Sequence, residues 1–281
     1  MNKEKQKARP NWLSTPTGKI SVGITVGLAL IYVIVFSIVV MKQKGKDNQN
    51  EITGETTEEQ QVEKKMTVIV DAGHGGRDPG KVSPNNNLEK DINLAIAMKL
   101  RDSLIKNNYE VIMTRDSDQV MSAESGKSKK MADLNNRISI INNSDADIVI
   151  SIHQNSFTDP KIKGAQVFYY LDNMEGEKLA TYIKTNINQD VDPTNKREIK
   201  GNKSFYILKE SNKPMAIVEC GFLSNPEEEA KLISSEYQDK LVSAITKSVE
   251  EYYTQNKTQN QSEAQNETQN EIQNQTQKEL P

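Results

Sequence analysis

The chain has 281 residues, with 36 basic and 39 acidic side chains and a formal net charge of −3. A balance so close to neutral gives no electrostatic reason to expect nucleic acid as a partner. The single cysteine excludes an intramolecular disulfide and a cysteine-rich zinc finger, and the two histidines exclude a site built from three of them.

The first element in chain order is an apolar run without a charged residue, from Ile20 to Met41. As a helix it would extend about 33 Å, enough to cross the core of a bilayer. Five basic residues precede the run and three follow it, which favours an N-terminus inside the cell and the rest of the chain outside. A cleaved signal peptide is the alternative, but no A-x-A site follows the run. We therefore expect a cytoplasmic basic tip at 1–19 and a single-pass anchor in the cell membrane at 20–41.

Two polar segments flank the central part of the chain. Residues 42–65 contain few apolar side chains and indicate a flexible stalk. Residues 254–281 are rich in Thr, Gln, Asn and Glu, and a segment of this composition buries too little apolar surface to order itself. We expect a disordered tail at 254–281 and one catalytic domain at 66–253, which is long enough for a substantial core.

Short apolar runs alternate with amphipathic stretches through this central domain. Runs typical of buried strands occupy residues 67–71, 109–114, 147–153, 165–170, 204–208 and 215–220. Apolar residues recur at helical spacing over residues 92–104, 132–142, 179–187 and 241–252. This alternation predicts an α/β fold in which helices cover both faces of a mainly parallel sheet.

Both histidines lie where predicted strands end. Sites in parallel sheets form at the carboxyl ends of the strands, which points to residues 71–80, 153–157 and 219–225. His74 follows the first strand in a glycine-rich segment, and His153 ends a later strand. One histidine in such a place is usually structural, but two together favour a metal site.

A catalytic zinc ion held by two histidines needs one further protein ligand and keeps a position for water. The candidates are Glu89, Asp91, Asp71 and Glu219. Taken alone, Glu89 is typical of a carboxylate that complements the first turn of a helix. Glu219 ends an apolar strand, where an unpaired charge is costly, and a carboxylate in such a place is suited to act as a general base.

Five segments carry a resemblance to a known family, and they occur in the order DAGHGG, LEKD, MTR, SIHQN and VECGFLSN. Together they resemble the Amidase_3 class of zinc-dependent N-acetylmuramoyl-L-alanine amidases, over residues 66–253. The resemblance implies an α/β fold and one zinc ion per chain held by His74, Glu89 and His153, with Glu219 as the catalytic acid/base. The segments KMADLNNR, KGAQVFYY, TNKREIKGNKSFYIL and YQDKL look most like the germination-specific spore-cortex (CwlD-type) amidases.

The resemblance further implies hydrolysis of the amide between N-acetylmuramic acid and L-alanine, in the peptidoglycan of the cell wall or the spore cortex. Zinc would lower the pKa of water and stabilise the oxyanion. Asp71 and Asn155 are candidates for orienting the ligands, although hydrogen bonding within the loops explains them as well. The partners expected are peptidoglycan, the membrane through Ile20–Met41 and, as a further candidate, an accessory protein. The catalytic domain would then lie outside the cytoplasm.

Other interpretations fit parts of the sequence. A zinc carboxypeptidase on a related scaffold would use the same residue types, whereas a catalytically inactive peptidoglycan-binding module would need none of them. Cys220 could act as a nucleophile with His153, but a cysteine within an apolar strand is more typical of a small core residue. Arg115 is a candidate contact for substrate carboxylates, or simply a solvated charge at a strand end.

Overall fold

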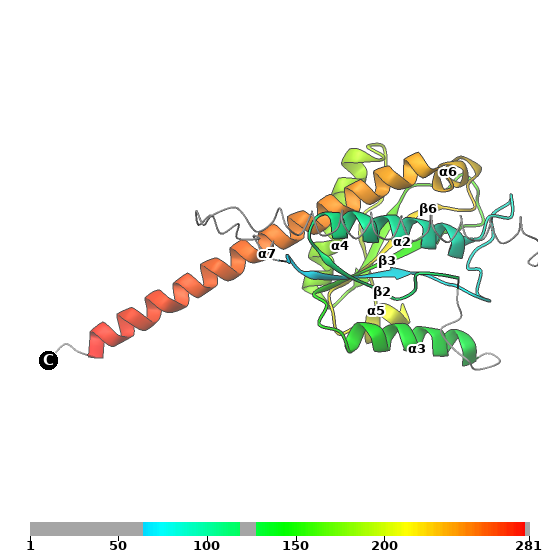
Figure 1. Cartoon of the computed structure of the whole chain (residues 1–281). Coiled ribbons are helices and arrows are strands. Elements are labelled where there is room, and N and C mark those ends of the chain that lie inside the picture. The colour runs from blue at the N-terminus through cyan, green and yellow to red at the C-terminus, as the bar shows by residue number, and fades with distance from the viewer. Residues whose placement is uncertain (1–63, 119–127, 279–281) are drawn as a thin grey trace, which may run out of the picture. The chain divides into compact units, whose positions relative to one another are not determined.

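The computed structural model describes residues 64–118 and 128–278 (Figure 1). The predicted basic tip, the membrane anchor and nearly all of the stalk lie outside the described residues. Within the described part of the chain, no helix is long and apolar enough to span a bilayer. The description below therefore concerns the predicted catalytic domain and the tail.

A six-stranded sheet forms the centre of the domain. Its strands are β1 (Thr67–Ala72), β2 (Glu110–Met113), β3 (Ile148–Asn155), β4 (Gln166–Tyr170), β5 (Lys200–Asn202) and β6 (Met215–Phe222). The order across the sheet is β2-β1-β3-β6-β4-β5. All neighbours are parallel except β4 and β6, so the prediction of a mainly parallel sheet is confirmed. No helix lies between β3 and β4, and without a crossover helix the chain returns in the opposite direction.

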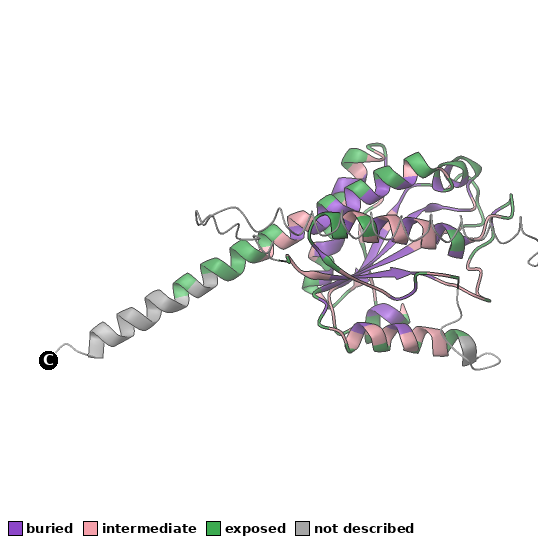
Figure 2. Cartoon of the chain, in the orientation of Figure 1, coloured by how far each residue is buried: buried purple, intermediate pink, exposed green. Residues whose placement is uncertain are grey.

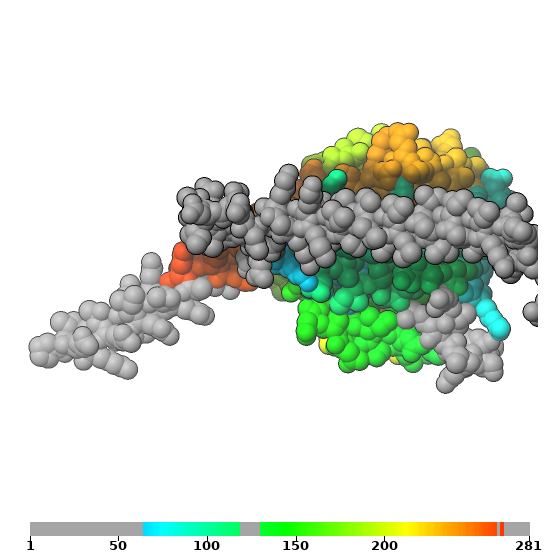
Figure 3. Space-filling view, viewed as in Figure 1, coloured from blue at the N-terminus to red at the C-terminus, as the bar shows by residue number. Residues whose placement is uncertain are grey.

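Helices cover both faces of this sheet, as expected for the α/β class. They are α2 (Glu89–Lys106), α3 (Ser128–Asn142), α4 (Met174–Asp190), α5 (Tyr206–Glu210), α6 (Pro226–Leu232) and α7 (Ser235–Lys278). α2, α4 and α7 pack together on one face, while α3 and α5 lie on the other (Figure 1). In the space-filling view, orange atoms of α6 and α7 mark the first layer and green atoms of α3 mark the second (Figure 3).

The strands of the sheet are largely buried (Figure 2). The two faces of the sheet bury separate cores, and the alternation of side chains along each strand assigns residues to them. In β6, Val218 and Cys220 belong to the larger core under α2, α4 and α7, whereas Ile217 belongs to the smaller core near α3 and α5. Because successive side chains of a strand point to opposite faces, Glu219 lies on the same face as Ile217. The same alternation in β3 places His153 on the face of α3 and α5.

One predicted strand is wrong. The apolar run at 204–208 forms most of helix α5, and the strand beside it, β5, covers Lys200–Asn202. The Oδ1 atom of Asn202 accepts hydrogen bonds from the backbone N–H groups of Ser204 and Phe205. A side chain that bonds the backbone in this way turns the chain and starts a helix. Because the run is short, its apolar character suited either structure.

The tail also differs from the expectation of disorder, because α7 continues without a break to Lys278 and projects from the domain (Figure 1). Residues 254–278 contain no glycine or proline, and Gln, Glu and Lys are good helix formers. A helix that is already nucleated by packing grows at little cost per residue. Lys178 of α4 fastens the first exposed turns through hydrogen bonds to Asn256 and Gln259.

Candidate metal centre and its surroundings

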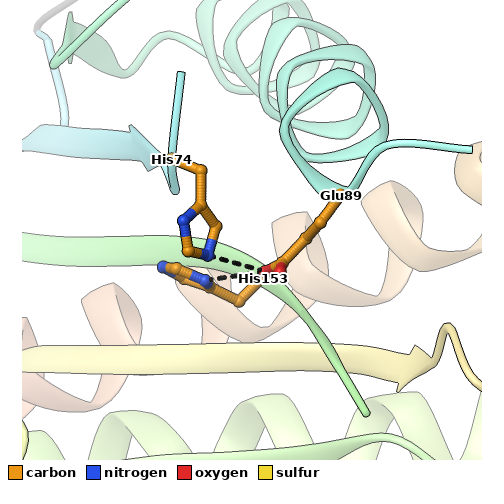
Figure 4. Close-up of side chains that lie close together, drawn as sticks. All are labelled: His74, Glu89 and His153. Carbon is orange, nitrogen blue, oxygen red and sulfur yellow. Dashed lines mark hydrogen bonds and ion pairs between the residues drawn. The ribbon is translucent and has the colours of Figure 1, made fainter. Parts of the chain in front are cut away.

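Three side chains from separate elements converge at the carboxyl ends of β1 and β3. His74 follows β1, Glu89 is the first residue of α2 and His153 belongs to β3 (Figure 4). The Oε1 atom of Glu89 lies 3.2 Å from Nε2 of His74 and 3.0 Å from Nδ1 of His153. One potential ligand atom from each residue lies within 4.8 Å of the others. The structure thus brings together the three residues that the resemblance to the amidase family implies as zinc ligands.

Two glycines allow this close approach. A Cβ atom on Gly73 would lie 2.2 Å from the ring of His153, so no larger residue fits there. Gly80 has a φ of 67°, and a Cβ atom on it would lie 2.5 Å from Oε2 of Glu89 and 2.7 Å from the His74 ring. The glycine-rich sequence after β1 therefore makes room for the two rings and the carboxylate.

The carboxylate of Glu89 is buried and held by backbone groups as well as by the histidines. Its side chain is 3% exposed. The N–H group of Lys81 donates to Oε2 at 2.8 Å, and the N–H group of Gln154 donates to Oε1 at 3.1 Å. Burial raises the pKa of Glu89, but the hydrogen bonds from His153 and His74 outweigh it and hold this pKa below its usual range. The group is therefore a carboxylate anion, as a metal ligand must be.

The second nitrogen of His74 has its own partner. Nδ1 lies 2.9 Å from Oδ2 of Asp78, whose Oδ1 accepts a hydrogen bond from the N–H of Gly80 at 3.1 Å. Burial lowers the pKa of His74, but Asp78 and Glu89 together raise it to about 9. Sequence reasoning did not single out Asp78. Its place in the same glycine-rich segment, four residues after His74, was the available signal.

Glu219 lies next to this group without joining it. It is paired in register with His153 on the neighbouring strand, and its Oε2 is shielded from solvent and has no hydrogen-bond partner among the described residues. Burial is the largest cause that raises the pKa of Glu219 to about 7, while His153 acts in the opposite direction. A cation held by the neighbouring rings would favour the charged form of this carboxyl group.

Two clefts meet at His74, His153 and Glu219. One cleft has an apolar wall, formed by Leu134, Phe205, Tyr206, Ile207 and Ile217. The other is lined by polar residues, among them Lys81, Gln154, Asn155 and Ser156. His74, His153 and Glu219 line both clefts, so an extended molecule can reach them from two sides.

Two other acidic candidates for the third ligand, Asp91 and Asp71, lie outside the convergent group. Asp91 is exposed. Asp71 is buried and accepts hydrogen bonds at 2.6 Å from Arg137 and from Thr114. Burial raises the pKa of Asp71, but the charge of Arg137 and the hydrogen bonds from Ser151 and Thr114 lower it to about 2. Arg137 also donates to the carbonyl oxygen of His74 at 2.6 Å. Asp71 therefore supports the site through Arg137.

Three further residues from the sequence analysis have structural roles. Asn155 lines the polar cleft, but its side chain accepts a hydrogen bond from the N–H of Ser156 at 2.8 Å. Arg115 is 5% exposed and donates to the carbonyl oxygens of Ala72, Gly73 and Lys90, which leaves it no path to a substrate. Cys220 is buried, and burial raises the pKa of its thiol to about 12. It therefore lacks the thiolate that a nucleophile needs.

Comparison with known proteins places the same region in one family. Residues 68–251 match the Amidase_3 family, described as N-acetylmuramoyl-L-alanine amidase. The germination-specific N-acetylmuramoyl-L-alanine amidase of Bacillus subtilis is 40% identical over 191 residues, which cover 67% of this chain and 80% of that protein.

Solved structures of the same kind are similar across the domain. The CwlD amidase of Clostridioides difficile, in complex with the GerS lipoprotein, is 40% identical with a TM-score of 0.66, and the match covers 67% of this chain and 98% of that one. AmiC2 of Nostoc punctiforme is 31% identical with a TM-score of 0.59, over 68% of this chain and 98% of that one. The range that matches the family, residues 68–251, spans the positions of His74, Glu89 and His153.

Proposed function

Because the chain belongs to the N-acetylmuramoyl-L-alanine amidase family, we propose that it is a zinc-dependent hydrolase of peptidoglycan. In this proposal one zinc ion binds His74, Glu89 and His153, and Glu219 transfers the proton. The observation that carries the proposal is the convergence of these three side chains beside the buried Glu219, whose Oε2 atom has no hydrogen-bond partner among the described residues.

The donor set fits zinc. Two imidazole nitrogens and one carboxylate oxygen are the three protein ligands found in many hydrolytic zinc sites, in which the fourth position stays open. Asp78 fits as well, because a histidine ligand commonly donates its other ring N–H to a carboxylate. When bound, zinc would supply a Lewis acid that lowers the pKa of water and polarises the scissile carbonyl group.

Glu219 would carry the proton between water and the leaving group. As a carboxylate it takes a proton from the attacking water molecule, whose oxygen forms the new bond to the carbonyl carbon of the muramic acid lactyl group. The C–N bond then breaks, and Glu219 returns the proton to the nitrogen of L-alanine. The shielded position of its Oε2 atom keeps bulk water from competing for this proton.

The similarity to relatives also supports a more specific setting. A germination-specific amidase is among the relatives, and we propose spore-cortex peptidoglycan as the substrate. A similar amidase forms a complex with a lipoprotein, so an accessory protein is a reasonable partner for this chain too. We further propose that residues 20–41 anchor the protein in the cell membrane with the catalytic domain outside the cytoplasm, as their length and flanking charges favour.

Digestion of purified peptidoglycan tests the proposal. The wild-type protein should release new amino-terminal L-alanine, lose this activity after treatment with a chelator and regain it when zinc is added. Release of carboxyl-terminal amino acids in its place would indicate a carboxypeptidase. Absence of any product from zinc-loaded protein, with binding to peptidoglycan intact, would indicate an inactive binding module.

A further inference from the structure

A short turn leads into the metal ligand Glu89 of the proposed zinc site. Residues 82–88, here called the 82–88 turn, lie between Lys81 and Glu89. The base of the turn is closed by a hydrogen bond from the N–H of Glu89 to the carbonyl oxygen of Lys81 at 2.9 Å. The N–H of Lys81 donates in return to the Glu89 carboxylate at 2.8 Å. A shift of the turn would therefore move both the backbone of Glu89 and a group that orients its carboxylate.

The opposite end of the turn is fastened to α6 by one carboxylate. Glu229 is 1% exposed. Its Oε1 accepts hydrogen bonds from the hydroxyl of Ser83 and, at 2.6 Å, from the side-chain amide of Asn87. Its Oε2 accepts one from the amide of Asn85 at 2.9 Å. Three side chains of the turn thus donate hydrogen bonds to the carboxylate of Glu229, which lies 140 residues after Glu89 in the sequence.

Hydrogen bonds, and not an ion pair with any of the described residues, hold this buried carboxylate. Within residues 64–118 and 128–278, no lysine or arginine forms an ion pair with Glu229. Burial raises the pKa of Glu229, but the hydrogen bonds from Ser83, Asn87 and Asn85 outweigh it and lower this pKa. Hydrogen bonds to an anion are stronger than those between neutral groups, so the charge makes the attachment of the turn firm.

The residue next to Glu229 fastens the same helix to the strand of Glu219. Glu228 accepts hydrogen bonds from the N–H groups of Phe222 at 2.7 Å and Gly164 at 2.9 Å. Phe222 is the last residue of β6, the strand that carries Glu219. α6 therefore joins two parts of the site: Glu228 holds it to β6, and Glu229 holds it to the turn that ends at Glu89.

We propose that Glu229 is a positioning residue, which fixes the metal ligand Glu89 through the 82–88 turn and so sets the affinity of the site for zinc. The inference rests on the proposed zinc site. Substitution of a group that orients a metal ligand commonly weakens metal binding by about 10- to 100-fold. Because Glu229 acts through the turn, we expect the lower end of this range.

The test compares Glu229→Gln with Glu227→Gln in the full-length protein. Glutamine keeps the size of the side chain but has one acceptor oxygen, and its amide would face the amide of Asn85. Glu227 lies on the same helix, and its side chain is 76% exposed, so it is a matched control. Zinc affinity is measured by competition with a chelator, and the melting temperature of the metal-free protein is measured in parallel.

We expect Glu229→Gln to bind zinc about tenfold more weakly than the wild type, with the metal-free melting temperature lowered by only a few degrees, and Glu227→Gln to match the wild type. Ser83→Ala, which removes one donor from the turn, should also weaken zinc binding. If Glu229→Gln does not fold, the zinc affinity of Ser83→Ala tests the inference in its place. Zinc affinity within twofold of wild type in the folded variants would overturn the inference. A wild-type protein that binds no zinc would instead contradict the proposed function.

Discussion

Asp78 holds the ring of His74 from the side opposite Glu89. Nδ1 of His74 lies 2.9 Å from the Asp78 carboxylate, and Nε2 lies 3.2 Å from Glu89. Because a carboxylate only accepts hydrogen bonds, Nδ1 must donate, and in the neutral ring the lone pair is then on Nε2. Asp78 thus selects the tautomer that can bind a metal ion from the side of Glu89 and His153.

This contact predicts how zinc affinity depends on pH. The pKa of His74 is raised to about 9 in the metal-free protein, since Asp78 and Glu89 outweigh the effect of burial. Zinc binds the neutral ring, so below that pKa it must displace a proton. We expect the apparent zinc affinity to rise about tenfold per pH unit from 7 towards 9 and then to level off. Competition with a chelator at several pH values measures it.

Asp78→Asn is the informative variant for that measurement. It removes a charge that raises the pKa of His74, so the rise with pH should flatten. It also loosens the ring, so affinity at pH 9 should be about tenfold weaker than in the wild type. An affinity that does not change with pH in the wild type would mean that His74 carries no proton to displace.

The strands and the two histidines could be predicted because the evidence for them is local. The runs that became β1, β3 and β6 are continuous and apolar, which is the pattern of strands buried on both faces. His74 and His153 follow such strands directly, so the rule that sites form at the carboxyl ends of strands located them. The choice of Glu89 among four acids came from resemblance to a family and not from spacing.

The supporting residues could not be predicted, because their roles depend on contacts between distant segments. Arg137 lies on α3 and reaches the carbonyl oxygen of His74, and Glu229 reaches the 82–88 turn from α6. In the sequence both are ordinary charged residues of amphipathic helices. The prediction of a strand at 204–208 was wrong for another reason. A short apolar segment without a clear period suits a strand or a helix equally.

Removal of any one ligand should abolish zinc binding and activity together. We expect His74→Ala, Glu89→Ala and His153→Ala to lose zinc, because each removes one of three protein ligands. Asp91→Ala is the matched control, since Asp91 is an exposed acid in the same helical turn as Glu89. Metal analysis of the purified proteins checks the expectation. Full zinc occupancy in Glu89→Ala would show that another group completes the site.

The buried pair of Asp71 and Arg137 should limit stability in acid. The pKa of Asp71 is lowered from 3.8 to about 2 in the folded chain, so the folded state binds this proton less readily than the unfolded state. The resulting stabilisation, roughly 2 kcal/mol, is fully present above pH 3.8 and is lost as the pH falls through 2. Urea unfolding between pH 2 and 5 measures it.

Asp71→Asn should lack this part of the pH dependence. It should also be less stable at neutral pH by about 1–3 kcal/mol, because the buried Arg137 loses one of its two carboxylate partners and keeps Asp133. Equal slopes of unfolding free energy against pH in the variant and the wild type would contradict the assignment to Asp71.

The proposed topology predicts that protease added to intact protoplasts removes the catalytic domain. The apolar run at 20–41 has five basic residues before it and three after it, which favours the larger part of the chain on the outside. Immunoblotting of treated protoplasts with an antibody against the domain detects the loss. A domain that survives until the cells are lysed would place it in the cytoplasm.

Glu219→Gln separates proton transfer from metal binding and so tests the proposed mechanism most directly. Glutamine preserves the size of the side chain but cannot take a proton from water. Zinc content and turnover of peptidoglycan are measured on the same preparation. The proposed roles predict zinc content near that of the wild type and turnover lower by roughly 10²–10⁴. Turnover within a few-fold of wild type, or loss of zinc together with activity, would contradict the assignment of Glu219 as the proton carrier.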